Sequence, residues 1–190
     1  MVDAGVNDID SFLRSPLYAP RWGWHDDHRH LDGTPDYRPA IQQVRGEFVE
    51  FLDLLRARGL CGSCLQLGMG ECDASHEVWR HRFAHVVTID RGRCKVDDAL
   101  LQGLDTHDKT ALALASVYGP YDLVFIDAGH SLEDVRNDHR DYMPLLRPRG
   151  IVAFHDALER PEYPEVGVPA YLSTLLNVHM IGSEVGIAWT

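Results

Sequence analysis

The sequence predicts an α/β fold with a seven-stranded, mostly parallel sheet, helices on both faces and an antiparallel hairpin at the C-terminal end. Three observations support this prediction. Short apolar runs alternate with longer segments of helical periodicity, which is typical of βαβ units. Three of the runs stop abruptly at glycine, histidine or aspartate, at positions 68–70, 127–130 and 155–156. Two last runs, residues 178–181 and 185–189, flank a tight turn and predict the hairpin.

The expected elements follow in order along the chain. Residues 1–37 have no sustained hydrophobic period and predict an N-terminal arm or lid, whereas residues 38–190 predict one folded domain. Apolar residues three and four apart predict a helix from Pro39 to Gly59. A capping pair at Ser131 and Asp134 begins another, which stops at 148–150. The other expected strands cover 63–67, 86–89, 100–104, 121–126 and 151–154, and the other helices cover 74–83, 108–117 and 168–176.

Composition and charge disfavour several classes of protein. With 190 residues and 45% apolar content, the chain has the size of one globular domain. A net charge of −11 opposes binding to nucleic acid. The sequence has no apolar stretch of about 20 residues and no pattern of a signal peptide, so we expect a cytoplasmic protein without membrane contact. The pair Cys61 and Cys64 lacks the partners of a zinc site, and we expect reduced, structural thiols. The sequence leaves open whether the chain forms a homo-oligomer.

The first strand end predicts a cofactor that contains ribose. Gly68 and Gly70 follow the apolar run of residues 65–67, and glycines at such a turn let backbone amides approach a ligand. Asp90 ends the next expected strand 22 positions after Gly68, which is close to the spacing at which an acid binds ribose hydroxyls. A dinucleotide fingerprint needs a third glycine, which residues 71–73 do not supply, so the pattern disfavours pyrophosphate binding at this turn.

Several segments resemble the class I S-adenosylmethionine-dependent methyltransferases. Within that class the chain is similar to small-molecule O-methyltransferases related to cephalosporin hydroxylase-like proteins and to macrolide and aminocoumarin sugar methyltransferases. The likeness covers about residues 39–190 and implies a Rossmann-like sheet. In place of the family's usual acid and third glycine, this chain has Gln66 and Cys72. The segments that carry the likeness are 65–70, Asp90, 103–108, 121–131 and 145–156, of which the last two are the most specific.

The resemblance implies that the chain moves a methyl group from S-adenosylmethionine to a hydroxyl of a small, sugar-like or natural-product acceptor. Two alternatives remain open: an NAD-dependent oxidoreductase, which the missing third glycine opposes, and a cofactor-binding module without catalysis. The cofactor-binding residues implied by the resemblance lie at the strand ends and in the turns beside them: Gln66, Leu67, Gly68, Gly70, Ser75, Asp90, Arg91, Asp105, Thr106 and Asp127.

The other two strand ends supply groups for the acceptor. The resemblance implies that a divalent cation would be held by Asp127, His155 and Asp156, with His155 in place of a common acid. Oxygen ligands suit Mg²⁺, whereas a histidine suits Mn²⁺, iron or zinc better, so the choice of metal stays open. Without a metal, His130 or His155 would act as general base, because imidazole titrates near neutral pH. The catalytic candidates are therefore Asp127, His130 and His155.

Histidines elsewhere in the chain give weaker indications of function. Histidines, acids and two tryptophans are dense in residues 22–30, for which metal binding, contact with the acceptor and a solvated lid are all open interpretations. We expect His107 and His139 to lie on the surface or in the packing between helices.

Overall fold

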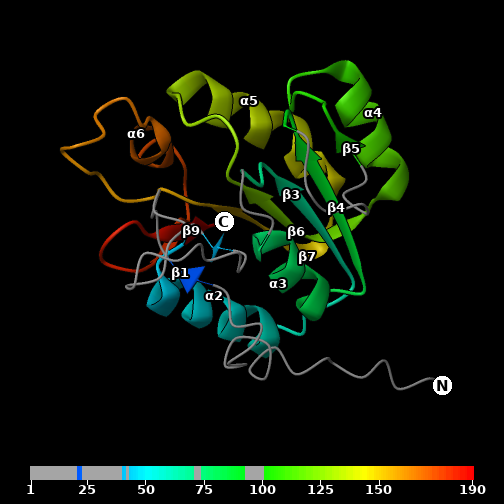
Figure 1. Cartoon of the computed structure of the whole chain (residues 1–190), viewed down its shortest axis with the longest axis horizontal. Coiled ribbons are helices and arrows are strands. Elements are labelled where there is room, and N and C mark those ends of the chain that lie inside the picture. The colour runs from blue at the N-terminus through cyan, green and yellow to red at the C-terminus, as the bar shows by residue number, and fades with distance from the viewer. Residues whose placement is uncertain (1–20, 23–39, 42, 71–73, 93–100) are drawn as a thin grey trace, which may run out of the picture.

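One sheet of seven strands organises the chain (Figure 1). The structure is a computed structural model, and it describes residues 21–22, 40–41, 43–70, 74–92 and 101–190. The spatial order of the strands is β5-β4-β3-β6-β7-β9-β8. The neighbours from β5 to β7 are parallel, whereas β9 is antiparallel to both β7 and β8. The strands are β3 (Ser63–Leu67), β4 (His85–Asp90), β5 (Leu101–Gln102), β6 (Tyr121–Ile126), β7 (Leu146–Phe154), β8 (His179–Ile181) and β9 (Ile187–Trp189).

Helices cover both faces of this sheet. One core cluster joins α2 and α3 to side chains such as Phe125 of β6, and the other joins α4, α5 and α6 to the opposite side chains, such as Val124. In Figure 1, α2 and α3 lie below the sheet, and α4 and α5 above it. Every residue of β3 and β6 is buried, as expected for parallel strands covered on both faces. The helices are α2 (Arg45–Ala57), α3 (Ala74–Arg82), α4 (Lys109–Tyr118), α5 (Leu132–Tyr142) and α6 (Val168–Leu172), with a 3₁₀ turn at Met143–Leu145.

The α/β architecture and the C-terminal antiparallel hairpin are confirmed. The bounds of β3 and β6 match those expected from their apolar runs. The strand expected at 86–89 is longer by one residue at each end, and the strand expected at 100–104 is reduced to two residues. The expected arm, residues 1–37, lies outside the described residues except at Arg21–Trp22, which form the short strand β1.

Three helices differ from their expected extents. The helix expected from Pro39 begins at Arg45, because residues 40–41 form β2 and pair with β1. The helix expected to reach 148–150 ends at Tyr142, since Pro144 has no backbone N–H to donate and the following 3₁₀ turn redirects the chain into β7. Helix α6 is also shorter than expected and ends at Leu172.

The sheet places the carboxyl ends of β3, β4, β6 and β7 at one edge, where open α/β sheets bind their ligands. No helix in the part of the chain that the structure describes combines the length and apolar character that spanning a bilayer requires.

Candidate active site

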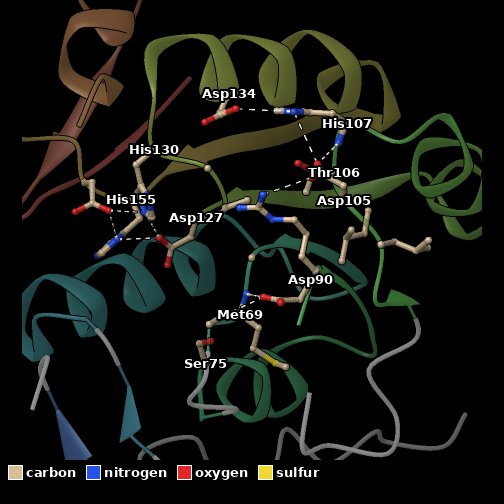
Figure 2. Close-up of a pocket in the computed structure, with 18 of the residues that line it drawn as sticks. Met69, Ser75, Asp90, Asp105, Thr106, His107, Asp127, His130, Asp134 and His155 are labelled. Atoms are coloured by element: carbon tan, nitrogen blue, oxygen red, sulfur yellow. Dashed lines mark hydrogen bonds and ion pairs between the residues drawn. The ribbon is translucent and has the colours of Figure 1, made fainter. Parts of the chain in front are cut away.

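A cavity of about 310 Å³ opens at this edge of the sheet (Figure 2). One of its ends lies beside the turn after β5, with Asp105 and His107, and the other lies beside Asp127, His130 and His155. The cavity is therefore built from the strand ends that the sequence singles out. Its lining residues are Gln43, Gly68, Met69, Gly70, Ser75, Ile89, Asp90, Arg91, Leu104, Asp105, Thr106, His107, Asp127, Ala128, Gly129, His130, Asp134, His155 and Asp156.

The carboxylate of Asp90 accepts hydrogen bonds from two turns at the wall of the cavity. Its Oδ2 accepts hydrogen bonds from the backbone N–H groups of Met69 at 2.7 Å and Gly70 at 3.1 Å. Its Oδ1 accepts a third from Gly92 at 2.6 Å. The carboxylate thus stands where the sequence predicts an acid for ribose, and it also fixes the glycine turn, a role that the spacing alone does not predict.

Gly68 is required by the neighbouring strand. Its φ is +83°, and a Cβ atom there would lie 2.1 Å from the carbonyl oxygen of Asp127 and 2.6 Å from Cα of Ala128. Any side chain at this position would force β3 and β6 apart. The sequence interpretation, in which the glycine admits a ligand, is therefore incomplete: Gly68 also lets Asp127 approach the glycine turn.

A buried polar network lies below the cavity. The Nε2 of Gln66 donates to Oγ of Ser75 at 2.8 Å, and the hydroxyl of Thr88 donates to Oε1 of Gln66 at 3.2 Å. Ser75 lines the cavity, whereas Gln66 and Leu67 are buried and lie outside its lining. The structure thus places Gln66 and Leu67 behind the lining of the cavity, where Gln66 holds the hydroxyl of Ser75.

The turn after β5 forms the other wall. Arg91 Nη1 lies 3.6 Å from Oδ2 of Asp105, and the hydroxyl of Tyr142 donates to the backbone oxygen of Thr106 at 2.6 Å. His107 lines the cavity, and its Nε2 lies 3.4 Å from Oδ1 of the buried Asp138 on α5. The expectation that His107 lies on the surface or in the packing of a helix is confirmed, since His107 is exposed and contacts α5; the sequence does not predict that it also lines the cavity.

Asp138→Asn is expected to stabilise the protein at neutral pH. Asp138 is fully buried, and burial raises its pKa from 3.8 to about 6. The native state then binds more protons than the unfolded state between these two values, so the stability associated with Asp138 is complete below about pH 4 and is lost as the pH rises through about 6. Asparagine does not ionise. We expect a gain of up to about 3 kcal/mol in the free energy of unfolding at pH 7, measured by urea denaturation.

The gain should disappear near pH 4, where the wild-type carboxyl is protonated. Glu133→Gln, an exposed substitution on the same helix, is the matched control and should change stability by a few tenths of a kcal/mol at either pH. An equal gain from Asp138→Asn at both pH values would contradict the argument from titration.

Two carboxylates and two imidazoles meet at the other end of the cavity. Asp127 follows β6 and Asp156 follows β7, and their carboxyl ends adjoin because the two strands are parallel neighbours. His155 Nδ1 lies 3.1 Å from Oδ1 of Asp127 and 3.0 Å from Oδ2 of Asp156. His130 Nε2 lies 3.5 Å from Oδ1 of Asp127 and 3.0 Å from Oδ2 of Asp156. The sequence predicts all four residues, and Figure 2 shows three of them pointing toward one another.

The charges in this cluster stabilise one another. Hydrogen bonds to Asp127 and Asp156 raise the pKa of His130 to about 10. Burial lowers the pKa of His155, but the charge of Asp127 and hydrogen bonds to both carboxylates outweigh it and raise that pKa to about 9. Burial acts to raise the pKa of each carboxyl group, but the two histidines hold both pKa values below their usual range. At neutral pH this arrangement therefore contains two carboxylates and two imidazolium rings.

The same cluster fits a divalent cation by its donor atoms. Asp127, His130 and Asp156 each offer one ligand atom, and these atoms lie within 4.8 Å of one another. Two carboxylate oxygens and one imidazole nitrogen suit Mn²⁺, iron or zinc, and the oxygens alone suit Mg²⁺. This set contains His130 where the sequence predicts His155.

One contact at the site could not be predicted from the sequence. Gln43 precedes α2 and donates through Nε2 to Oδ2 of Asp127 at 2.9 Å, across 84 positions of the sequence. No periodicity or motif marks Gln43. His139 packs against Phe154 and lies 2.7 Å from the hydroxyl of Tyr171, in agreement with the expected helix packing. Residues 23–30, the histidine-rich segment, lie outside the described residues.

Comparisons with known proteins identify several similar chains. A family described as a methyltransferase domain matches residues 24–157. Demethylmacrocin O-methyltransferase from Streptomyces fradiae is 28% identical over 167 residues, which cover 76% of this chain and 35% of that protein.

Solved structures show the same fold. The MycE methyltransferase of the mycinamycin biosynthetic pathway, in complex with Mg, S-adenosylhomocysteine (SAH) and mycinamycin VI, is 18% identical with a TM-score of 0.58, covering 74% of this chain and 48% of that one. An O-methyltransferase from Bacillus cereus, in complex with SAH, is 17% identical with a TM-score of 0.55. The match covers 77% of this chain and 81% of that one. The chain thus spans about half of MycE and about a third of the Streptomyces protein.

Proposed function

The chain belongs to the family defined by this methyltransferase domain, and from that premise we propose that it transfers a methyl group from S-adenosylmethionine to a hydroxyl of a small, sugar-like or natural-product acceptor. The observation that carries the proposal is a single cavity that joins the glycine turn and Asp90 to the cluster of Asp127, His130 and Asp156. A nucleoside-binding wall and a proton-accepting cluster in one cavity are what such a transfer needs.

The cofactor end of the reaction is assigned to the walls around Asp90 and Asp105. Asp90 is placed to accept hydrogen bonds from ribose hydroxyls, with Gly68 and Gly70 leaving the backbone accessible beside it. Asp105 and Thr106 line the region for the purine, and Ser75 offers a hydroxyl held by Gln66. When bound, S-adenosylmethionine supplies a methyl group already activated by the positive sulfur, so the chain's own task is to position the acceptor oxygen.

The acceptor end is assigned to His130 and the two carboxylates. The side chain of His130 is 43% exposed, whereas those of His155 and Asp156 are 4% and 5% exposed, so His130 is the member of the cluster that an acceptor can reach. Because His130 carries a proton at neutral pH, it accepts the hydroxyl proton only in the fraction of molecules in which Nε2 is neutral, and this fraction grows as the pH rises toward its pKa of about 10. Asp127 and Asp156 orient the ring and stabilise the imidazolium that forms.

A divalent cation held by Asp127, His130 and Asp156 would replace His130 as the activating group, because it would act as a Lewis acid on the acceptor oxygen while His130 served as its ligand. His155 would remain outside this ligand set and fix the carboxylates through Nδ1. The names of two similar proteins support this class of reaction, since one is an O-methyltransferase for demethylmacrocin and the other was solved with Mg and mycinamycin VI.

The two alternatives lack such support. An NAD-dependent oxidoreductase would need a glycine turn suited to pyrophosphate, and residues 71–73 supply no third glycine. A cofactor-binding module without catalysis would not need two carboxylates and two imidazoles gathered at the cavity.

Calorimetric titration with SAH tests the proposal. We expect micromolar binding by the wild type, and a loss of about 100-fold or more in Asp90→Ala, because that substitution removes a charged acceptor for the ribose and releases the glycine turn. Asp53→Ala, an exposed change on α2, is the control and should bind SAH as the wild type does. A folded wild type that binds NAD and not SAH would overturn the proposal.

A further inference from the structure

Asp156 is surrounded by positive groups of the chain itself. Its Oδ2 lies 3.0 Å from both His130 Nε2 and His155 Nδ1. Its Oδ1 accepts a hydrogen bond from Nη2 of Arg160, a residue that no sequence motif marks. Both oxygens of this candidate metal ligand are therefore engaged by the protein, and one of the partners is a guanidinium, which keeps its charge at every physiological pH.

Arg160 is held in place by its own loop. It lies four residues after Asp156 in the segment between β7 and α6, and its side chain is 14% exposed. The guanidinium carbon lies 4.7 Å from the centre of the Tyr163 ring, a cation–π contact. The N–H of Tyr163 also donates to the backbone oxygen of Arg160 at 3.0 Å. The arginine is thus preorganised beside Asp156.

The start of this loop is fixed to the rest of the fold. The N–H groups of Ala157 and Leu158 donate to the backbone oxygens of Gly186 at 3.2 Å and Val185 at 2.9 Å, in the turn between β8 and β9. Asp156 itself has a φ of 55°, a left-handed conformation that aspartate tolerates better than most residues. Backbone contacts on both sides therefore hold Asp156 and Arg160 in their relative positions.

We propose that Arg160 is a built-in competitor for the divalent cation at Asp127, His130 and Asp156, so that a metal ion binds there only when Arg160 leaves Asp156. This inference rests on the proposed function for the identity of the site. A guanidinium and a metal ion compete for the same carboxylate charge, and a fixed positive group a few ångströms from a dication opposes its binding. Arg160 thereby makes metal affinity at this site weak and dependent on the conformation of the loop that carries it.

Mn²⁺ binding tests the proposal without any acceptor. Free Mn²⁺ is measured by electron paramagnetic resonance in titrations of the wild type, Arg160→Met and Arg160→Lys. Methionine keeps much of the length of the side chain and removes its charge, so we expect Arg160→Met to bind Mn²⁺ at least tenfold more tightly than the wild type, and Arg160→Lys to stay within about threefold of it. Arg140→Met, which removes an exposed arginine paired with Asp141, is the control and should leave the affinity unchanged.

Three results would overturn the proposal: equal affinity in the wild type and Arg160→Met, weaker binding in Arg160→Met, or no Mn²⁺ binding by either. Tyr163→Leu is a second variant, which keeps the charge and removes the platform under it, and it should give an affinity between those of the wild type and Arg160→Met. SAH titration of the same samples separates the two proposals. If SAH binds normally and Arg160→Met has the same Mn²⁺ affinity as the wild type, only the role of Arg160 is rejected. If the wild type does not bind SAH, the methyltransferase function is rejected.

Discussion

Asp127→Asn is expected to lower kcat for methyl transfer by about 10²–10³-fold. Asparagine keeps the shape of the side chain but removes the negative charge that orients His130 and His155 and stabilises the imidazolium formed when the acceptor loses its proton. The amide would also place an N–H group toward either the Nε2 of Gln43 or the Nδ1 of His155. Transfer of a radiolabelled methyl group from S-adenosylmethionine, with any hydroxylated acceptor that supports turnover, measures the effect.

Affinity for SAH distinguishes an effect of Asp127→Asn on methyl transfer from an effect on cofactor binding. Asp90, Asp105 and the glycine turn are unchanged in Asp127→Asn, so affinity for SAH should fall far less than kcat. Asp53→Asn, an exposed substitution of the same chemistry on α2, is the control and should leave both quantities unchanged. A kcat within tenfold of the wild type would mean that the cluster at the ends of β6 and β7 is not where the acceptor reacts.

The sequence was sufficient to predict the strand ends that build the cavity. Runs such as residues 123–126 are apolar throughout, because helices bury both faces of the sheet, and the chain then turns polar at Asp127. Parallel strands bring their carboxyl ends to one edge. Consequently Gly68, Asp90, Asp127 and Asp156 could be assigned to one site without knowledge of any contact.

Residues outside the strand ends could not be assigned in this way. Gln43 and Arg160 reach the carboxylates from a segment before α2 and from a loop, where no hydrophobic period specifies the direction of a side chain. The contact of His107 with Asp138 could not be assigned either, because the two residues are on different elements, and only the packing of α5 against the turn after β5 brings them together. The distinction between His130 and His155 as metal ligands likewise depends on ring orientation, which sequence spacing does not encode.

The largest effect on stability is expected from Glu47→Ala. Glu47 lies in the first turn of α2, is 7% exposed, and accepts three backbone hydrogen bonds from the turn between β8 and β9: Ser183 N–H at 2.6 Å and Glu184 N–H at 2.8 Å on Oε1, and Gly186 N–H at 2.8 Å on Oε2. Alanine would leave these N–H groups without their acceptor. We expect a loss of about 3–5 kcal/mol in the free energy of unfolding and a Tm lower by about 10 °C, measured by thermal and urea denaturation.

Two variants on α2 test whether the hydrogen bonds of Glu47 account for the loss of stability. Glu47→Gln keeps one carbonyl acceptor and should lose about half as much stability, whereas Glu50→Ala, exposed one turn along α2, should change it by less than about 0.5 kcal/mol. Equal losses in Glu47→Ala and Glu50→Ala would show that the carboxylate contacts are not responsible.

The contacts of Glu47 also bear on the candidate active site. Gln43 precedes the same helix, and the loop that carries Arg160 is hydrogen-bonded to the same turn at Gly186. Loss of the hydrogen bonds between Glu47 and this turn should therefore make the contacts of Gln43 with Asp127 and of Arg160 with Asp156 less well ordered. We therefore expect Glu47→Ala to lower kcat even at temperatures where the protein remains folded.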